Sequence, residues 1–394
     1  MIRKYRLLAL LLFVLAVSFS LQLGGQNKEP DEVVLPIWFG PQVQVVPTGL
    51  TPAQVRRAYG FDQLTNRGAG QTIAIVDAYD QPYIEEDLAV FSQTFNLPQC
   101  TTANGCFRKI TTTKNGTKPP IRQIWGLEIS LDVEWAHAIA PDARILLIET
   151  KSAKLAELME AIDLAVQNGA TIVSMSWGGP EFAGQLAYDS RLLASNVTFI
   201  AASGDFGTGA FYPASSPNVI GVGGTTLNVD AQGKYLSETA LSVSGGGLSA
   251  FEKEPIYQAQ FRIPNNPEHM RGVPDVAYNA DHATGFAVYS SFPYLGQRGW
   301  IQVGGTSAGA PQWAGLFAIA NSMRIQANKA PFTGGADALY SAAKLNGLAK
   351  FNDITSGGNG SCGVMCTAGP GFDYLTGLGS PRANLLVPAL VAWQ

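Results

Sequence analysis

Apolar runs alternate with helix-like segments through the first half of the chain. Continuous apolar runs predict buried parallel strands, because neither face of such a strand is polar; they occupy residues 72–77, 143–149, 171–176, 198–202 and 219–222. Apolar residues at helical spacing predict helices between them, at 84–95, 155–167 and 185–195. This alternation predicts an α/β fold whose doubly wound, mostly parallel sheet is flanked by helices, with functional loops at the carboxyl ends of the strands.

Outside this core, the pattern is less regular. Thr51 and Pro52 predict the start of a short helix that ends near Tyr59, with the threonine as its cap. Residues 21–47 show no helical period and predict an extended leader, and residues 227–300 are irregular and rich in β-forming residues.

A glycine-rich turn at residues 304–311 joins a predicted strand to a predicted helix at 312–324. Pro311 lies in the first turn of that helix, where a missing N–H costs nothing. Ser307 therefore stands where unpaired N–H groups converge, which suits a nucleophile whose product is an oxyanion. The alternative is that Thr306 or Ser307 only caps the helix, so a nucleophile would need a base from elsewhere in the chain.

Two acids share the apolar face of a helix predicted within residues 122–140. Glu128 and Asp132 lie about 40° apart around its axis, on the side that carries Trp125 and Trp135. A surface acid pair is the alternative, but like charges at this spacing cost about 0.2–0.5 kcal/mol, and solvent-facing acids would not share a face with tryptophans. Burial raises carboxyl pKa values and close carboxyls can share a proton, so the pair can supply a base and its orienting partner.

Histidine is a weaker candidate for the base. His137 lies about 180° from Glu128 on the same helix, and His269 and His282 stand in polar loops without a neighbouring motif.

A glycine-flanked acid, Asp205, follows the strand predicted at 198–202. A protonated carboxyl at this edge of the sheet would donate a hydrogen bond to an oxyanion, and burial or low pH can keep it protonated. An ordinary turn aspartate is the alternative. Asp77 also ends a strand, and we interpret it as structural.

Composition limits the classes of function. The 394 residues are 46% hydrophobic and 14% charged, which allows a large core in one domain. The net charge of −4 gives no electrostatic footprint for nucleic acid. Few ionisable groups and three histidines are compatible with acidic surroundings.

The amino terminus is typical of an export signal. Basic residues precede the apolar run at 7–17, which is too short to span a bilayer and is followed by a small-x-small site within residues 1–20. An uncleaved anchor is the alternative. In an exported chain, the close pairs Cys100/Cys106 and Cys362/Cys366 predict two small-loop disulfides, and a zinc site made by all four thiolates is the alternative.

Taken together, these residues resemble the sedolisins, the serine-carboxyl peptidases on a subtilisin-like fold. The matching segments, in the family's chain order, are Glu128-x-x-x-Asp132, Ser203-Gly204-Asp205 and Gly305-Thr306-Ser307, with supporting matches at 75–79, 174–178, 273–276 and 376–379. The resemblance covers residues 48–394 and implies a single large catalytic domain. Family members usually carry a large amino-terminal prodomain, whereas only residues 21–47 separate the expected signal from this domain.

The resemblance also implies a role for each matching residue. Ser307 would be the nucleophile, Glu128 the general base and then acid, Asp132 the residue that orients Glu128, and Asp205 a donor to the oxyanion. Ser176, Trp177 and Gly178 would line the substrate cleft. One structural Ca²⁺ would be bound by the Asp353 and Asp373 carboxylates and by the carbonyls of Ile354, Gly369 and Gly371, a set of oxygens that suits a hard cation; an ordinary glycine-rich loop is the alternative.

We therefore expect a secreted or periplasmic, acid-active endopeptidase that acts as a monomer on protein or peptide substrates, without nucleic acid and without a membrane once the signal is cleaved. The alternatives are a tripeptidyl-peptidase of the same family and a non-catalytic binding protein that retains the fold.

Overall fold

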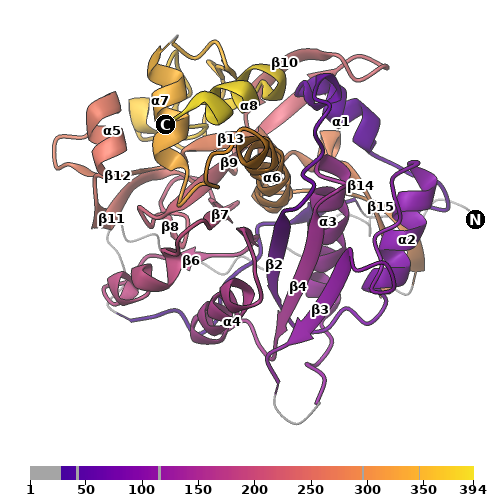
Figure 1. Ribbon diagram of the computed structural model, residues 1–394. Coiled ribbons are helices and arrows are strands. Elements are labelled where there is room, and N and C mark those ends of the chain that lie inside the picture. Colours follow the sequence, from indigo (N-terminus) through magenta and orange to yellow (C-terminus); the bar gives the residue numbers. More distant parts are fainter. Residues whose placement is uncertain (1–27, 41–43, 114–116, 295–296, 346) are drawn as a thin grey trace, which may run out of the picture.

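A mostly parallel sheet forms the central layer of the computed structural model, which describes residues 28–40, 44–113, 117–294, 297–345 and 347–394 (Figure 1). Its order is β10-β9-β7-β5-β2-β4-β3, with β13 paired to β9. The strands are β2 (Thr72–Ala78), β3 (Phe107–Thr111), β4 (Arg144–Thr150), β5 (Ile172–Met175), β7 (Thr198–Ala202), β9 (Val219–Val229), β10 (Tyr235–Ala240) and β13 (Val276–Asn279). Within this sheet β10 is antiparallel to β9 and the other neighbours are parallel, so the predicted sheet is confirmed.

Helices cover both faces of the sheet (Figure 1). They are α1 (Pro52–Ala58), α2 (Ile84–Thr94), α3 (Gln123–Ile139), α4 (Leu155–Gln167), α5 (Ile256–Phe261), α6 (Gly309–Gln326), α7 (Ala336–Leu345) and α8 (Ala383–Ala392). Successive side chains of β2 point to opposite faces: Ile73 and Ile75 join the core with α3 and α6, whereas Ala74 and Val76 join a second core with α4. Both faces of β2 are buried away from water, which explains the continuous apolar run at residues 72–77 of the sequence.

Shorter strands surround this core. β1 (Trp38–Phe39), β14 (Phe286–Tyr294) and β15 (Gln297–Gly304) form one small antiparallel sheet; β11 (Gly247–Lys253) pairs with β12 (Met270–Val273), β16 (Phe351–Asn352) with β17 (Ser380–Pro381), and β6 (Gly179–Pro180) with β8 (Phe211–Tyr212). The β-rich character expected for residues 227–300 is thus confirmed. The expected export signal at 1–20 lies outside the described residues, as do positions 21–27 and 41–43 of the expected leader.

The helix predicted at 185–195 is wrong. The segment forms two short 3₁₀ turns, Gln185–Ala187 and Asp189–Leu192. A surface helix gains stability by burying its apolar stripe, yet Leu186 and Leu193 are exposed. Only one leucine of the segment, Leu192, is buried, and the Gln185 amide is held by the carboxylates of Glu181 and Glu252, to which it donates.

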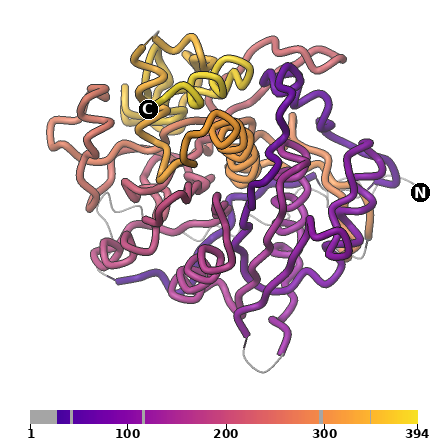
Figure 2. Tube along the Cα trace, in the orientation of Figure 1, coloured from indigo at the N-terminus to yellow at the C-terminus, as the bar shows by residue number. Residues whose placement is uncertain are grey.

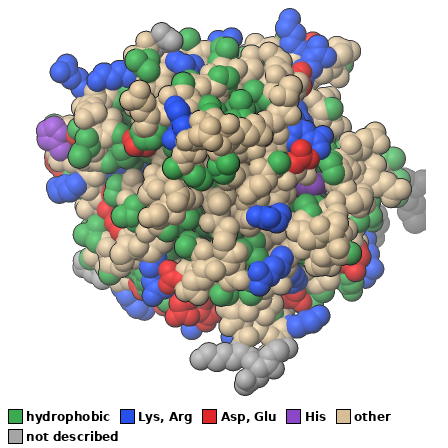
Figure 3. All heavy atoms as spheres, viewed as in Figure 1, with side chains coloured by type: hydrophobic (Ala, Val, Ile, Leu, Met, Phe, Trp, Pro, Cys, Tyr) green, Lys and Arg blue, Asp and Glu red, His purple; other side chains and the backbone are tan. Residues whose placement is uncertain are grey.

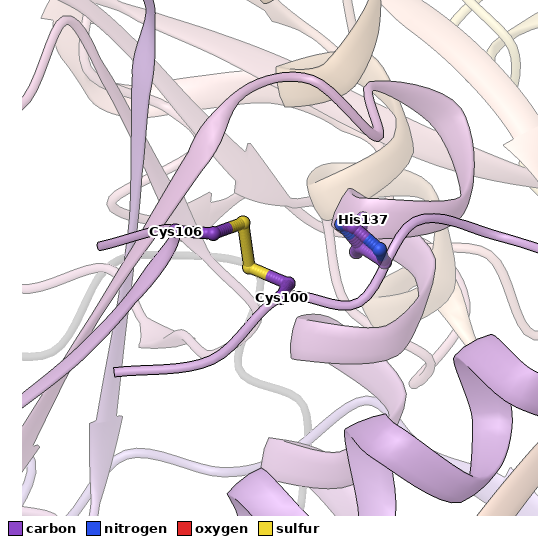
Figure 4. A group of neighbouring side chains, drawn as sticks. All are labelled: Cys100, Cys106 and His137. Carbon is purple, nitrogen blue, oxygen red and sulfur yellow. A yellow bond between two sulfur atoms is a disulfide. The ribbon is translucent and has the colours of Figure 1, made fainter. Parts of the chain in front are cut away.

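Both predicted disulfides are present. Cys100 bonds Cys106 and Cys362 bonds Cys366, so the zinc alternative for the four thiolates is wrong. His137 lies beside the first disulfide (Figure 4), and its Nε2 is 2.8 Å from the carbonyl oxygen of Pro98.

Uncharged side chains and backbone dominate the face of the molecule drawn in Figure 3, and Lys and Arg are interspersed with Asp and Glu around them. This distribution agrees with the low charged fraction of the sequence. Within the described ranges, no helix has the length and apolar character that crossing a bilayer requires.

Candidate functional site

Three neighbouring strands bring polar groups to one edge of the sheet. β5 lies between β2 and β7, and all three run parallel, so their carboxyl ends meet. Asp77 lies at the end of β2, Ser176 follows β5, and Asp205 follows β7. This is the edge at which sites form in open α/β sheets.

Ser307 approaches the same edge from a different direction. It lies in a short 3₁₀ turn (Thr306–Ala308) that connects β15 to α6, directly after Gly305, whose φ of +110° disfavours other residues. Its side chain is fully buried. The Ser307 hydroxyl donates to the main-chain oxygen of Ser176 (3.3 Å), and the Ser176 hydroxyl donates to the main-chain oxygen of Ser307 (3.2 Å).

Glu128 and Asp132 project from α3, the helix predicted within residues 122–140. Every residue from Trp125 to Ile139 is buried, so the polar face of the helix is buried as well as the apolar one. On that other face the Glu134 carboxylate accepts from the Tyr289 N–H (3.0 Å), and His137 bonds the Pro98 carbonyl instead of the site. The other two histidines lie next to Glu254 and Asp281, so no histidine ring in the described part of the chain forms a hydrogen bond or an ion pair with Ser307.

The pKa values of both α3 acids are raised well above their usual range. Burial is the largest cause for each. The charge of Asp77 is the next cause for both, and Glu128 adds to the shift of Asp132. The hydroxyls of Ser307 and Ser176 oppose these effects at Glu128 and Asp132 respectively, although their hydrogen bonds go to main-chain oxygens.

Asp77 belongs to this group, although the sequence led us to interpret it as structural. Burial raises its pKa to about 8. Within the described ranges, the carboxylate oxygens of Asp77, Glu128 and Asp132 are buried without a hydrogen-bond partner and without an ion pair. Burial and mutual repulsion oppose the ionisation of all three carboxyls together, which is why the pKa of each is raised. The sequence signal for Asp77 was its position at the end of a predicted strand; the neighbouring position of that strand and β5 is known only from the structure.

Asp205 is held by the residue before the serine. Its Oδ1 accepts from the Thr306 N–H (2.9 Å) and the Thr306 hydroxyl (2.8 Å). Burial raises the pKa of Asp205 to about 6, and the Thr306 hydrogen bonds partly offset that rise. Oδ2 is buried and has no hydrogen-bond partner among the described residues, so one oxygen remains for an additional contact.

Ser176, Trp177 and Gly178 extend from β5 past the serine. The Trp177 indole is buried and donates to the Val76 carbonyl (2.7 Å), so this side chain is anchored to β2. The main chain of Gly178 forms two hydrogen bonds with Val34, which belongs to the leader at residues 21–47.

The expected metal ligands form a separate cluster near the carboxyl terminus. The Gly371 N–H donates to both carboxylate oxygens of Asp353 (3.1 and 3.3 Å), which joins the two halves of the cluster. Asp373 is buried and accepts from Gly369, Leu375 and Thr376, and burial raises its pKa to about 6.

Several oxygen atoms of this cluster are available to bind a cation. Among the described residues, the carbonyls of Ile354, Gly369 and Gly371 accept no hydrogen bond, and neither Asp353 nor Asp373 forms an ion pair. Carboxylates and free carbonyls in one loop are the donor set that Ca²⁺ prefers, so the residues fit this ion.

Comparisons with known proteins agree with the fold and the motifs. A sequence model described as the subtilase family matches residues 115–336. Kumamolisin from Bacillus sp. strain MN-32 is 34% identical over 88% of this chain and 64% of its own, and tripeptidyl-peptidase 1 from Dictyostelium discoideum is 29% identical over 86% of this chain and 58% of its own. The chain therefore spans less than two thirds of the length of these relatives.

A solved structure gives a similar result. Pseudomonas sedolisin, described as a serine-carboxyl proteinase complexed with two molecules of pseudo-iodotyrostatin, superposes with a TM-score of 0.73 at 28% identity. The match covers 87% of this chain and 98% of that one.

Asp77→Asn is expected to increase stability near neutral pH. The folded protein keeps Asp77 protonated up to about pH 8, whereas the unfolded chain ionises it near pH 4. A carboxyl with a raised folded pKa therefore contributes most below about pH 4, and this contribution falls by up to about 1.4 kcal/mol per pH unit as the pH rises to 8. Thermal melts from pH 4 to 8 should show a shallower loss of Tm in the variant. The exposed Asp62→Asn serves as a control with the wild-type slope, and equal slopes for Asp77→Asn and wild type would contradict the assignment.

Proposed function

Because the chain belongs to the subtilase family and, within it, to the sedolisins, we propose that it is a serine-carboxyl peptidase that hydrolyses protein or peptide substrates. The observation that carries this proposal is that the buried Ser307 hydroxyl interacts with the buried Glu128 carboxyl and lowers its pKa, against the larger effect of burial. The activity of the serine is then governed by carboxyl groups alone.

In the proposed reaction, Ser307 Oγ attacks the carbonyl carbon of the substrate while Glu128 takes its proton. The negative charge that develops on the carbonyl oxygen is stabilised by the Ser307 N–H and by a protonated Asp205. Glu128 then gives its proton to the leaving amine, and a water molecule hydrolyses the resulting ester by the same steps in reverse order.

Asp132 and Asp77 would assist this proton transfer by their electrostatic effect on Glu128. Both interact electrostatically with Glu128 in a dry environment. If Asp132 and Asp77 stay protonated while Glu128 is ionised, the site carries one buried charge instead of three, which is less costly. Asp132 therefore orients the base, and Asp77 adjusts its proton affinity.

An extended chain fits on both sides of Ser307, which supports an endopeptidase. Gly178 provides a main-chain edge on one side, and β15 provides another on the opposite side, where it already pairs with β1. An enzyme that removed tripeptides would need the first side to be closed three residues from the serine. The name of one relative, tripeptidyl-peptidase 1, makes that activity the alternative.

Export is proposed from the signal-like residues 1–20 together with the two disulfides, because structural disulfides persist in oxidising compartments. We expect the exported protein to act as a monomer.

The proposed activity should decrease as the pH rises through about 6, where Asp205 loses the proton that it donates. Hydrolysis of a denatured protein, followed from pH 3 to 9, measures this dependence. Ser307→Ala should reduce kcat by several orders of magnitude while the melting temperature is kept. A maximum near pH 8, or an active Ser307→Ala variant, would exclude this mechanism.

Asp205→Asn tests the role of the second acid. Its Oδ1 can still accept from Thr306, and its amide donates at every pH, so the loss of activity near pH 6 should disappear. Asp205→Ala removes the donor and should lower kcat by about 10²–10³. If Asp205→Asn keeps the wild-type fall near pH 6, another group is responsible for it.

Ca²⁺ would be bound by Asp353 and Asp373 and by the carbonyls of Ile354, Gly369 and Gly371. The ion would neutralise the buried carboxylate of Asp373 and fasten the loop at 369–373 to the segment that carries Asp353, which now touch through the Gly371 N–H. Its role would be structural, because these residues form a cluster separate from Ser307.

Chelation of calcium is expected to lower the Tm, because an ion that binds only the folded state stabilises it by mass action. Differential scanning fluorimetry with EDTA, followed by added CaCl₂, measures the shift and its recovery. Asp353→Asn, at an exposed ligand, should abolish the sensitivity to EDTA, whereas Asp62→Asn should keep it. A wild-type melt that EDTA does not change would remove the calcium site.

A further inference from the structure

The two proposed oxyanion donors are held in different ways. The Ser307 N–H belongs to the 3₁₀ turn that runs directly into α6, and it donates to the carbonyl oxygen of Pro36 in the leader (3.2 Å). Asp205 lies in a loop, residues 204–209 (the Asp205 loop), that belongs to no helix or strand. The position of its carboxyl group therefore depends on the segments that pack against this loop.

A glycine-rich segment, residues 243–246, binds the Asp205 loop through the main chain. The Gly207 N–H donates to the Val243 carbonyl (2.8 Å), and the Gly245 N–H donates to the Gly204 carbonyl (2.6 Å). Glycine restricts the backbone less than any other residue, so further contacts contribute to the position of this loop as well.

A second loop, residues 358–367 (the disulfide loop), supplies such contacts. It belongs to the carboxyl-terminal part of the chain, whose yellow segments lie at the top of Figure 2. The Asn359 N–H donates to the Cys366 carbonyl (3.1 Å), and the bond between Cys362 and Cys366 closes the tip of the loop. The shape of the disulfide loop is thus fixed by a hydrogen bond at its base and a covalent bond at its tip.

The two loops touch at residues 207 and 208. The Thr208 hydroxyl oxygen is 3.8 Å from the Cys362 sulfur. A Cβ on Gly207 would lie 3.1 Å from the Asn359 carbonyl oxygen, and a Cβ on Gly360 would lie 3.5 Å from the Thr208 methyl carbon. Contacts this close leave no room for a water molecule between these atoms.

Asn359 also connects the disulfide loop to the glycine-rich segment. Its side chain is 7% exposed, and its Nδ2 donates to the Ser244 carbonyl (2.8 Å). Breaking a buried hydrogen bond of this kind is costly, because its groups are left without partners. Asn359 therefore joins residues 243–246 and the Asp205 loop, both of which it contacts.

Exclusion of water is what favours the protonated form of Asp205. Burial raises its pKa to about 6, against the opposing hydrogen bonds of Thr306 and of Trp38 on β1. Glu128 on α3 is the titratable group that faces Asp205, whose charge raises the pKa of Glu128. Residues 243–246 and 358–367 include no ionisable side chain apart from the bonded cysteines. If the Asp205 loop moved and admitted water, the pKa of Asp205 would fall toward its ordinary value of about 4.

We propose that the disulfide loop is a positioning element for the reaction: the Cys362–Cys366 bond keeps Asn359 packed against the Asp205 loop, and this contact holds Asp205 in place and away from water. The proposal rests on the proposed peptidase function. Asn359 and the disulfide would act through Asp205 without touching the substrate. Loss of the bond would lower kcat and hydrate Asp205 while every group that contacts the substrate is retained.

The double variant Cys362→Ser/Cys366→Ser tests the proposal. Its kcat for a denatured protein at pH 4 should fall by about tenfold or more, because a misplaced oxyanion donor stabilises the transition state less, whereas KM should stay within about threefold. Its activity should also be lost below the pH of about 6 expected for wild type, since a hydrated Asp205 loses its proton at lower pH.

The matched control is Cys100→Ser/Cys106→Ser. This disulfide lies beside His137 and directly before β3 (Figure 4), so its removal should leave kcat and the pH dependence at their wild-type values. Melting curves identify the variants that are folded at the assay temperature. Equal changes in the two folded double variants, or wild-type kcat and pH dependence after loss of the Cys362–Cys366 bond, would overturn the proposal.

A pair of single substitutions tests the same contact with the disulfide intact, and decides the question if the double variant does not fold. Asn359→Ala removes the bond to the Ser244 carbonyl and should lower both kcat and the pH at which activity is lost. Val364→Ala, at a side chain of the same loop that is 65% exposed, should keep both within about twofold of wild type. Equal behaviour of these two variants would overturn the proposal.

The Asp205→Asn background separates positioning of Asp205 from a general loss of stability. Its amide donates at every pH, so Cys362→Ser/Cys366→Ser should no longer change the pH dependence there. A pH shift that persists in this background would mean that the disulfide loop acts through another group, and the proposal would be wrong.

Wild-type activity distinguishes this inference from the proposed function. If wild type hydrolyses the denatured protein at acidic pH and loss of the Cys362–Cys366 bond changes nothing, only the positioning role is wrong. If wild type hydrolyses no protein at acidic pH, the peptidase proposal is wrong, and this inference fails with it.

Discussion

Carboxyl groups buried away from water impose the main constraint on this protein. Asp77, Glu128, Asp132 and Asp205 are at most 3% exposed, and within the described ranges none of them forms an ion pair. An isolated buried charge is costly enough that such groups hold protons instead. In the proposed mechanism, the serine among them would work with a base and a donor that are both carboxyl groups, and this arrangement would suit acidic surroundings.

The layers of the fold bring these groups together. The parallel strands β2, β5 and β7 end at one edge, which places Asp77, Ser176 and Asp205 on neighbouring strands. α3 packs on one face of that sheet and supplies Glu128 and Asp132, and the turn before α6 supplies Ser307. Each group lies in a helix, a strand or a 3₁₀ turn or within three residues of one, so the geometry does not depend on a long loop.

Sequence patterns predicted the parts whose stability is local or periodic. The buried strands were recognisable because both of their faces are apolar, and α3 because Glu128 and Asp132 share a face with two tryptophans. Three features could be seen only in the tertiary structure. The segment at 185–195 has helical spacing, but the polar contacts of Gln185 stabilise 3₁₀ turns instead. The role of Asp77 depends on which strands are neighbours, and chain order alone does not specify that. The path of residues 33–39 past Ser307 could not be predicted either, since an extended leader carries no periodic signal.

The missing N–H of Pro36 has a consequence for how firmly the leader is held beside Ser307, where the Ser307 N–H donates to the Pro36 carbonyl. A peptide with another residue at this position could donate one more hydrogen bond, to Ser176 O, and a typical hydrogen bond contributes about 0.5–1.5 kcal/mol. By that difference, the leader would give way to a competing peptide up to about tenfold more readily than a segment that has an N–H there. The leader would thus be the weaker competitor for the position next to Ser307.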